Sequence, residues 1–199
     1  MTFREYRYLI FSDLFRLNRQ FTLGSLLCEI WKGDSYAFSF WMRTARWTNR
    51  NAVLKWTLYP FVRFFYRHYQ YKLGISISYD TEIGSGFYIG HFSCIVVHTD
   101  VRIGKNCNIS QGVTLGLSCR GPSKGVPSIG DNVYIGPGAK VIGNVHIGDG
   151  AAIGANGVVT KDVPPNGVCV GVPGKCISDK GSEGYIINTD YDRYLTIPR

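Results

Sequence analysis

The 199 residues, 45% of them hydrophobic, can form one domain with a buried core and an appendage, and their composition excludes a disordered chain. The formal charge of +8 arises entirely in residues 1–72, which hold twelve Lys or Arg against four Asp or Glu. The six cysteines lack the close pairs of a zinc or thioredoxin site, and no secretory segment opens the chain. We therefore expect a reducing, cytoplasmic location.

The first 72 residues are predicted to form an aromatic, basic α-helical segment. They carry twenty of the aromatic side chains. Thr2 and Glu5 have the spacing of a capping box, and apolar residues follow at helical intervals to about Asn18. The other expected elements are a helix over 23–31 ended by Gly33 and an aromatic helical stretch over 36–71 that Pro60 breaks or kinks.

This helical segment contains no run of the roughly 20 apolar residues that a membrane span needs. Trp, Phe and Tyr instead alternate with Arg, as in residues 41–47 and 56–71, a composition that suits a bilayer surface or a partner helix. The aromatic-rich composition is explained equally well if the rings pack against one another and against the next domain. Nucleic acid is not expected as a partner, because no binding motif accompanies the basic residues.

From residue 73 the composition shifts to Ile, Gly and Ser, and an aliphatic residue returns at every sixth position. The spacing is unbroken from Ile129 to Val159, and an earlier run from Ile77 to Leu115 contains a two-residue slip after Ile95. A period of six predicts short strands joined by tight turns, with three hexads closing one triangular coil around a shared interior. A β-sandwich is the alternative, but it seldom keeps one spacing for so long.

Fourteen residues separate Leu115 from Ile129 where six are expected, so residues 116–128 should form a loop outside the coil. Insertions of this kind often carry the binding function of a solenoid. Two prolines after Val159 should end the ladder of strands. The predicted division is a helical segment over 1–72, a β-helix domain over 73–176 with the loop 116–128, and a tail over 177–199.

Histidines are the informative side chains in a wall built from Ile, Val and Gly. His91 stands two places after Ile89, and His98 follows near the slip. One coil after His91 comes Gln111, so these two side chains should be neighbours. An imidazole with an ordinary pKa of about 6.5 suits a general base at neutral pH, although surface histidines are common.

The remaining motifs carry less information. No phosphate-binding loop, dinucleotide fingerprint, nucleophile elbow or zinc-protease motif occurs. Lys161 and Lys175 flank the turns at the end of the coil, where they could meet phosphate groups or serve only as solubilising charges.

Three stretches carry a family resemblance: residues 109–116, 129–139 and 159–175. With them, residues 77–178 resemble the hexapeptide-repeat acyltransferases, and within these the serine acetyltransferase branch. The resemblance implies a mainly β fold, a left-handed parallel β-helix of hexapeptide repeats. It also implies a homotrimer, acetyl-CoA as a co-substrate bound between two subunits, and no metal or permanently bound cofactor.

The resemblance also assigns roles to residues. The catalytic histidine of the family falls on His91, which would take the proton from an acceptor hydroxyl as it attacks the thioester directly. Gln111 or His98 would assist its orientation. The other positions implied are Pro137 and Ala155, along the pantetheine arm, and Lys161 and Lys175, near the phosphates.

The chain differs from serine acetyltransferases at the positions that bind the acceptor substrate in that family. Their aspartates near the histidine fall on Gly90 and Ser76, and their loop Arg-His pair falls on Gly125 and Val126. A site without this carboxylate clamp is expected to disfavour an amino acid.

The chain looks more like the short enzymes that O-acetylate sugars in capsule, exopolysaccharide or lipopolysaccharide biosynthesis. The acceptor expected is then a carbohydrate such as a lipid-linked one, met at the inner face of the membrane through residues 1–72. Serine O-acetylation is the alternative within enzymes, and a non-catalytic β-helix scaffold or binding protein is the alternative outside them.

Overall fold

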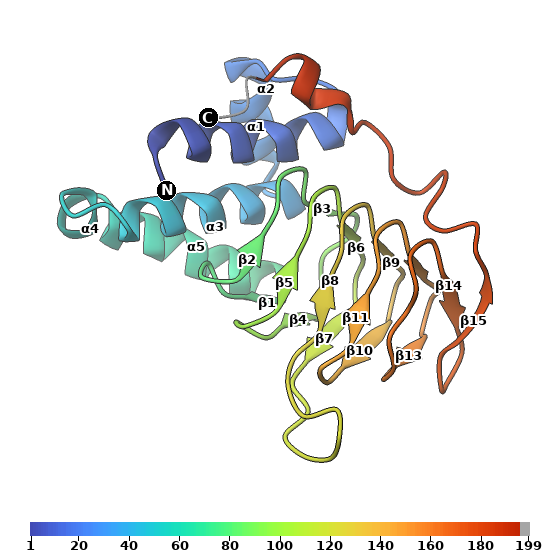
Figure 1. Cartoon of the computed structure of the whole chain (residues 1–199). Coiled ribbons are helices and arrows are strands. Elements are labelled where there is room, and N and C mark those ends of the chain that lie inside the picture. The colour runs from blue at the N-terminus through green and yellow to red at the C-terminus, as the bar shows by residue number, and fades with distance from the viewer. Residues whose placement is uncertain (196–199) are drawn as a thin grey trace.

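The structure, a computed structural model, describes residues 1–195. An α-helical segment precedes a parallel β-helix, as Figure 1 shows, so the predicted architecture is confirmed. None of the described helices is long and apolar enough to cross a membrane. The helices are α1 (Phe3–Asn18), α2 (Leu23–Lys32), α3 (Ser35–Asn49), α4 (Leu54–Thr57) and α5 (Tyr59–Leu73), with a short 3₁₀ helix, η1 (Asp190–Arg193), in the tail.

Local sequence signals account for the ends of these helices. The predicted capping box is present, since Glu5 N donates to Thr2 Oγ1 over 3.2 Å and Thr2 N donates to Glu5 Oε2 over 2.7 Å. Gly33 ends α2 in the left-handed conformation, at φ 73°. Pro60 lies in the first turn of α5, where the missing N–H costs no helical hydrogen bond.

Three sheets form the faces of the coil, and successive turns add one parallel strand to each, except that the second sheet has none from the last turn. The first contains β1 (Ile75–Ile77), β4 (Ile95–Val97), β7 (Thr114–Gly116), β10 (Lys140–Ile142) and β13 (Val158–Val159). The second contains β2 (Glu82–Ile83), β5 (Arg102–Ile103), β8 (Ser128–Ile129) and β11 (His146–Ile147). The third contains β3 (Tyr88–Ile89), β6 (Asn108–Ile109), β9 (Tyr134–Ile135), β12 (Ala152–Ile153), β14 (Val168–Val170) and the antiparallel β15 (Lys175–Ser178).

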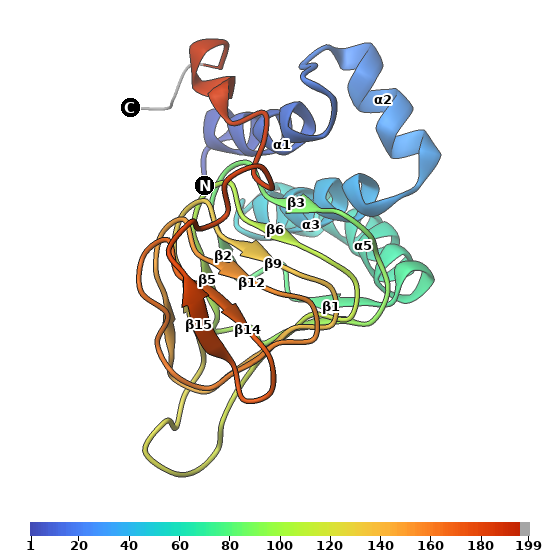
Figure 2. The same ribbon diagram turned by 90° about the vertical axis from the view of Figure 1, so that its right-hand side faces the viewer.

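The coil is left-handed and its interior is aliphatic. Figure 2 looks along it from the C-terminal end, and the chain turns clockwise from β1 through β2 toward β3 as it advances toward the viewer. The aliphatic residues that recur at every sixth position point into this interior, and Ile77, Ile109 and Ile135 among them are fully buried. Parallel pairing stacks them in ladders that close the core.

The two-residue slip lies earlier than predicted. Val97 pairs with both Ile77 and Leu115, so it continues the ladder that the hexad pattern assigned to Ile95. Ile95 and Val97 lie two positions apart on the same strand face, so both are buried. Because both are also aliphatic, the sequence does not show which of them belongs to the ladder. The extra residues therefore widen the corner between β3 and β4, where Ser93 and Cys94 have φ values of 95° and 54°.

The predicted loop leaves the coil between β7 and β8 and projects below it in Figure 1. Its stem is held by two backbone hydrogen bonds, from Ser118 N to Gly125 O over 2.9 Å and from Gly125 N to Ser118 O over 3.0 Å.

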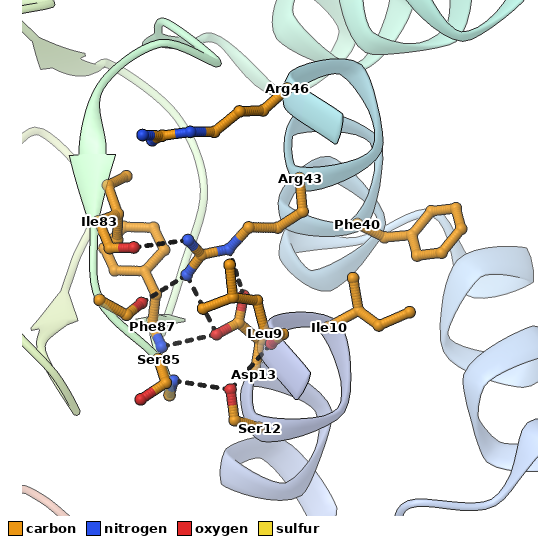
Figure 3. A network of polar contacts seen from close by, with 12 residues as sticks. Leu9, Ile10, Ser12, Asp13, Phe40, Arg43, Arg46, Ile83, Ser85 and Phe87 are labelled. Carbon is orange, nitrogen blue, oxygen red and sulfur yellow. Dashed lines mark hydrogen bonds and ion pairs between the residues drawn. The ribbon is translucent and has the colours of Figure 1, made fainter. Parts of the chain in front are cut away.

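A buried ion pair joins the helical segment to the first turn of the coil (Figure 3). Arg43 Nε on α3 lies 3.0 Å from Asp13 Oδ2 on α1, and both side chains are almost completely buried. The Arg43 guanidinium also donates to the carbonyls of Ile83 and Gly84 over 2.7 and 2.6 Å, and Asp13 Oδ1 accepts from Phe87 N over 2.8 Å. Desolvation raises the pKa of the Asp13 carboxyl and Arg43 opposes that rise.

The tail folds back over the coil onto α1 (Figure 1). Tyr191 is buried, and its hydroxyl bonds Ser85 and Asn106 over 3.0 and 2.8 Å. A disulfide joins Cys169 on β14 to Cys176 on β15. The last four residues of the predicted tail lie outside the described residues, and the division at 72/73 and 176/177 stays a proposal.

Candidate functional site

One corner of the coil stacks three of the predicted site residues in a column and carries His91 one turn earlier. Ile109, Ile135 and Ile153 pair in register, which places the residues two positions after them in line: Gln111, Pro137 and Ala155. Two backbone hydrogen bonds of 2.8 Å hold this register past the strands, from Gly138 N to Gln111 O and from Asn156 N to Pro137 O. In the widened corner Ser93 O accepts from Gly112 N over 2.9 Å, so Ser93 takes the place opposite Gln111 and His91 lies among the extra residues of that corner. The predicted pairing of His91 with Gln111 stays a proposal.

His91 occupies the widened corner and is exposed. Within residues 1–195 its imidazole makes no hydrogen bond. Gly90 precedes it, and a Cβ built there would meet its nearest neighbour, Tyr88 Cε1, at 3.6 Å, an ordinary contact. Space therefore exists beside the ring for a side chain that this chain does not supply.

A cavity of about 220 Å³ separates His91 from the helical segment. Residues 87–92 line one side, and the other is lined by residues of α1, α2 and the start of α3, including Glu29, Asp34 and Ser39. Asp34 stands at the N-cap of α3 without bonding its backbone, so its carboxylate is not committed to the helix end. No lysine or arginine is among the described residues that line this cavity.

The polar groups around the cavity differ in their partners. Glu29 is paired with Lys32 over 2.6 Å, and the Tyr36 hydroxyl donates to Ile10 O over 2.9 Å. Burial raises the pKa of Tyr36, so its hydroxyl stays protonated. Asp13 is bound to Arg43. Asp34 and His91 are therefore the titratable groups that remain to meet a ligand.

Gln111 Oε1 is a buried acceptor that makes no hydrogen bond within the described residues. Such atoms are rare in folded proteins, because an unpaired buried acceptor loses its water without replacement. Its place in the column one turn after His91 marks a point where an N–H group of a ligand is needed.

His98 is not brought to His91 within one chain. It follows β4, at the corner that leads to the second sheet, whereas His91 lies at the corner before β4. Its Nδ1 accepts from Asp100 N over 3.3 Å and lies 3.8 Å from Asp100 Oδ2. A role beside His91 therefore requires a second copy of the chain.

The two predicted lysines lie apart from each other. Lys175 is exposed and pairs with Val170 at the end of the sheet that follows the column. Lys161 is exposed after β13, at the corner that also carries His98 and the loop. Only Lys175 is close to the end of the column in the same chain.

A larger groove of about 670 Å³ lies elsewhere, between α1, α3 and the second sheet. It contains Arg46, Arg50 and Arg102, but none of its described lining residues is a histidine, cysteine or serine. Volume alone would favour this groove, but the carboxylates in it, Glu5 and Glu82, are bound to Thr2 N and Arg102, and its described lining offers no imidazole. The chemistry favours the smaller cavity at His91.

Comparison with known proteins agrees with the repeat architecture. The family described as bacterial transferase hexapeptide (six repeats) matches residues 127–161. Serine acetyltransferase from Bacillus pumilus is 37% identical over 148 residues, covering 73% of this chain and 67% of that protein. The chain belongs to the serine acetyltransferase family. It spans between 44% and 67% of the length of the most similar curated relatives.

Solved structures of this family align with most of the chain. Serine acetyltransferase from Brucella abortus in complex with coenzyme A gives a TM-score of 0.70 at 26% identity, covering 89% of this chain and 69% of that chain. Soybean serine acetyltransferase complexed with serine gives a TM-score of 0.68 at 28% identity, covering 87% and 70%. Both the coil and the helices before it therefore belong to the common fold.

The departures from the serine acetyltransferase pattern have different structural reasons. An aspartate fits at Gly90, as the contact distance above shows. Gly125 has φ +134°, and a Cβ there would lie 2.9 Å from Asn144 Cβ, so an arginine requires a different loop backbone. The loop has therefore changed shape, whereas the corner at His91 has only lost a carboxylate.

Proposed function

We propose that the protein is an acetyl-CoA-dependent O-acetyltransferase in which His91 is the general base. The observation that supports this proposal is the corner where exposed His91 lines a cavity one turn before the column of Gln111, Pro137 and Ala155. His91 takes the proton of the acceptor hydroxyl as its oxygen attacks the thioester carbonyl. Collapse of the tetrahedral intermediate releases the CoA sulfur, which receives that proton from the imidazolium. No acyl-enzyme or metal ion enters this sequence.

Acetyl-CoA is a co-substrate that the column suits. Its pantetheine arm carries amide N–H groups, and Gln111 Oε1 offers the acceptor that one of them needs. Backbone at Pro137 and Ala155 continues the same line toward Lys175, whose ammonium suits the phosphates.

A homotrimer completes this proposed site. The loop 116–128, Lys161 and His98 lie at a different corner from His91 in one chain, so they reach the coenzyme only from a neighbouring subunit. The groove between two coils then holds acetyl-CoA, with the loop of one subunit over the acceptor cavity of the next.

Serine is the first candidate acceptor, because the relatives at 37% to 44% identity are serine acetyltransferases. This reverses the order predicted from sequence, in which a carbohydrate came first. The carbohydrate stays as second candidate on one observation: no described residue lining the cavity is cationic, so a substrate carboxylate lacks a partner there. Asp34 suits the ammonium group of serine.

Release of free thiol from acetyl-CoA by the purified protein tests the acceptor. We expect release that depends on serine. Release with bacterial glycans and none with serine would move the function to the carbohydrate. No release with either, and no CoA binding in calorimetry, would indicate the non-catalytic scaffold.

Replacing Gly90 by aspartate is expected to shift the pH-rate profile. A carboxylate beside His91 stabilises the imidazolium form of the ring relative to the neutral form. A general base acts when deprotonated, so the acidic limb of kcat/KM moves to higher pH. Gly90→Asn has the same shape without charge and should leave the limb in place. An unmoved limb in Gly90→Asp would mean that His91 is not the titrating base.

A further inference from the structure

The outer face of α4 and α5 carries apolar and basic side chains that remain largely exposed, although Phe61 also contacts Trp41 on α3. We define the α4–α5 face by Val53, Lys55, Trp56, Phe61, Arg63, Phe64, Arg67 and Tyr71. Trp56 is 81% exposed, Val53 71%, Phe64 68% and Tyr71 74%. Large hydrophobic side chains gathered in this way mark an interaction surface.

The face follows from the helical pattern of α5. Val62, Tyr66 and Leu73 form the inner stripe and are buried in the core. Phe64 and Tyr71 lie on the opposite side of the helix, with Phe61 on the flank toward α3. Arg63 and Arg67 lie on the other flank, where they border a groove along the first sheet. The helix is therefore apolar on two faces, of which the fold uses one.

The positive charge around the α4–α5 face indicates the kind of partner that it would bind. Residues 35–79 contain seven Lys or Arg and no Asp or Glu. Arg43 and Arg46 turn inward to the coil, whereas Lys55, Arg63 and Arg67 are exposed. A surface that unites protruding Trp and Phe with cations, and lacks any carboxylate, is complementary to a layer of anionic headgroups above hydrocarbon.

We propose that the α4–α5 face binds the surface of a membrane that contains anionic lipids. Trp56, Phe61 and Phe64 enter the boundary between headgroups and acyl chains, and Lys55, Arg63 and Arg67 meet lipid phosphates. Like charge disfavours a second copy of the same face as occupant. A nucleic acid would use the cations but leave the apolar stripe in water.

The C-terminal end of α5 approaches the candidate site. α5 ends at Gly74, and a Cβ there would lie 3.3 Å from Cys94 N, in the corner that carries His91. Figure 2 shows α3 and α5 on the side of the coil from which the β3 to β4 corner projects. The surface is independent of acetyl transfer, so its test does not depend on the acceptor.

Sedimentation of the full chain with vesicles tests the proposal. Vesicles of phosphatidylcholine alone are compared with vesicles that contain about one third phosphatidylglycerol, a strongly anionic surface. We expect binding to the anionic vesicles only, weakened by salt. The paired change Arg63→Glu and Arg67→Glu should lower the partition coefficient at least about 30-fold, and Trp56→Ser with Phe64→Ser should lower it comparably.

Matched controls lie at the other end of the coil. Ile177 is 67% exposed on β15 and Lys180 is exposed after it, so Ile177→Ser and Lys180→Glu alter one apolar and one basic surface residue. Both should bind vesicles like the unchanged chain. Equal losses in these controls would show a general charge effect and overturn the proposal, as would binding of a DNA duplex without binding of vesicles.

Tryptophan fluorescence gives a readout that does not depend on variants of the face. Trp31 is the other highly exposed tryptophan, so Trp31→Phe leaves Trp56 as the main exposed reporter. Anionic vesicles should move its emission to shorter wavelength, because the indole leaves water. An unchanged spectrum at saturating vesicle concentration would contradict insertion of this face.

Discussion

His91→Ala is expected to lower kcat for thiol release by about 10²- to 10⁴-fold, the usual contribution of a positioned general base. The affinity for CoA should remain unchanged, because the backbone of the column does not depend on the ring. Stability should also remain unchanged, since the imidazole is exposed and makes no hydrogen bond within residues 1–195. Steady-state kinetics, calorimetry with CoA and thermal unfolding together measure these three quantities.

The matched control is His146→Ala. His146 is also an exposed histidine of the coil, and its Nδ1 lies 3.0 Å from Ser128 Oγ on the second sheet, away from the column. It should retain full rate. Full rate in His91→Ala, or an equal loss in both variants, would remove His91 from the mechanism.

Arg43→Ala is expected to lower the free energy of unfolding by about 3–5 kcal/mol, because it leaves Asp13 as a buried carboxylate without its partner. The carbonyls of Ile83 and Gly84 lose their donors as well. Urea unfolding measures the loss. The double change Asp13→Ala with Arg43→Ala should recover part of it, since no uncompensated charge then remains.

Arg102→Ala is the control for this ion pair. Arg102 Nε lies 3.2 Å from Glu82 Oε2 on the neighbouring strand, but both side chains are mostly exposed. Exposed pairs contribute less than about 1 kcal/mol. Equal destabilisation by Arg102→Ala and Arg43→Ala would show that the buried network does not hold the helical segment on the coil.

The coil was predictable because its repeat is a local property of the chain. A six-residue period determines strand, turn and facing interior together, so it places the buried aliphatic residues of each coil without any structure. The capping box at Thr2 and the outward loop are equally local. The position of the two-residue slip could not be predicted, because Ile95 and Val97 are both aliphatic and both buried.

The acceptor cavity could not be predicted, because it depends on contacts between distant segments. Asp34 and Glu29 meet the His91 corner only through the docking of α1, α2 and α3, and that docking rests on Asp13 and Arg43. Neither residue has a sequence neighbour that marks it as buried. The return of Tyr191 to the first coil, and the pairing of Cys169 with Cys176, likewise follow from the tail's path and from no periodic signal.

Gln111 shows the limit of periodicity in another way. The spacing predicts its place beside His91, but only the structure shows that its Oε1 is buried and without a partner in the described chain. A pattern of residue types reports which side chains are neighbours. It does not report which of their atoms remain available to a ligand.

The most direct measurement is a crystal structure of the protein with bound CoA. The proposed function predicts the CoA sulfur beside the His91 imidazole and the pantetheine arm along Gln111, Pro137 and Ala155, in a groove between two subunits. A coenzyme bound in the groove of Arg46 and Arg102, or one whose sulfur lies away from His91, would contradict it.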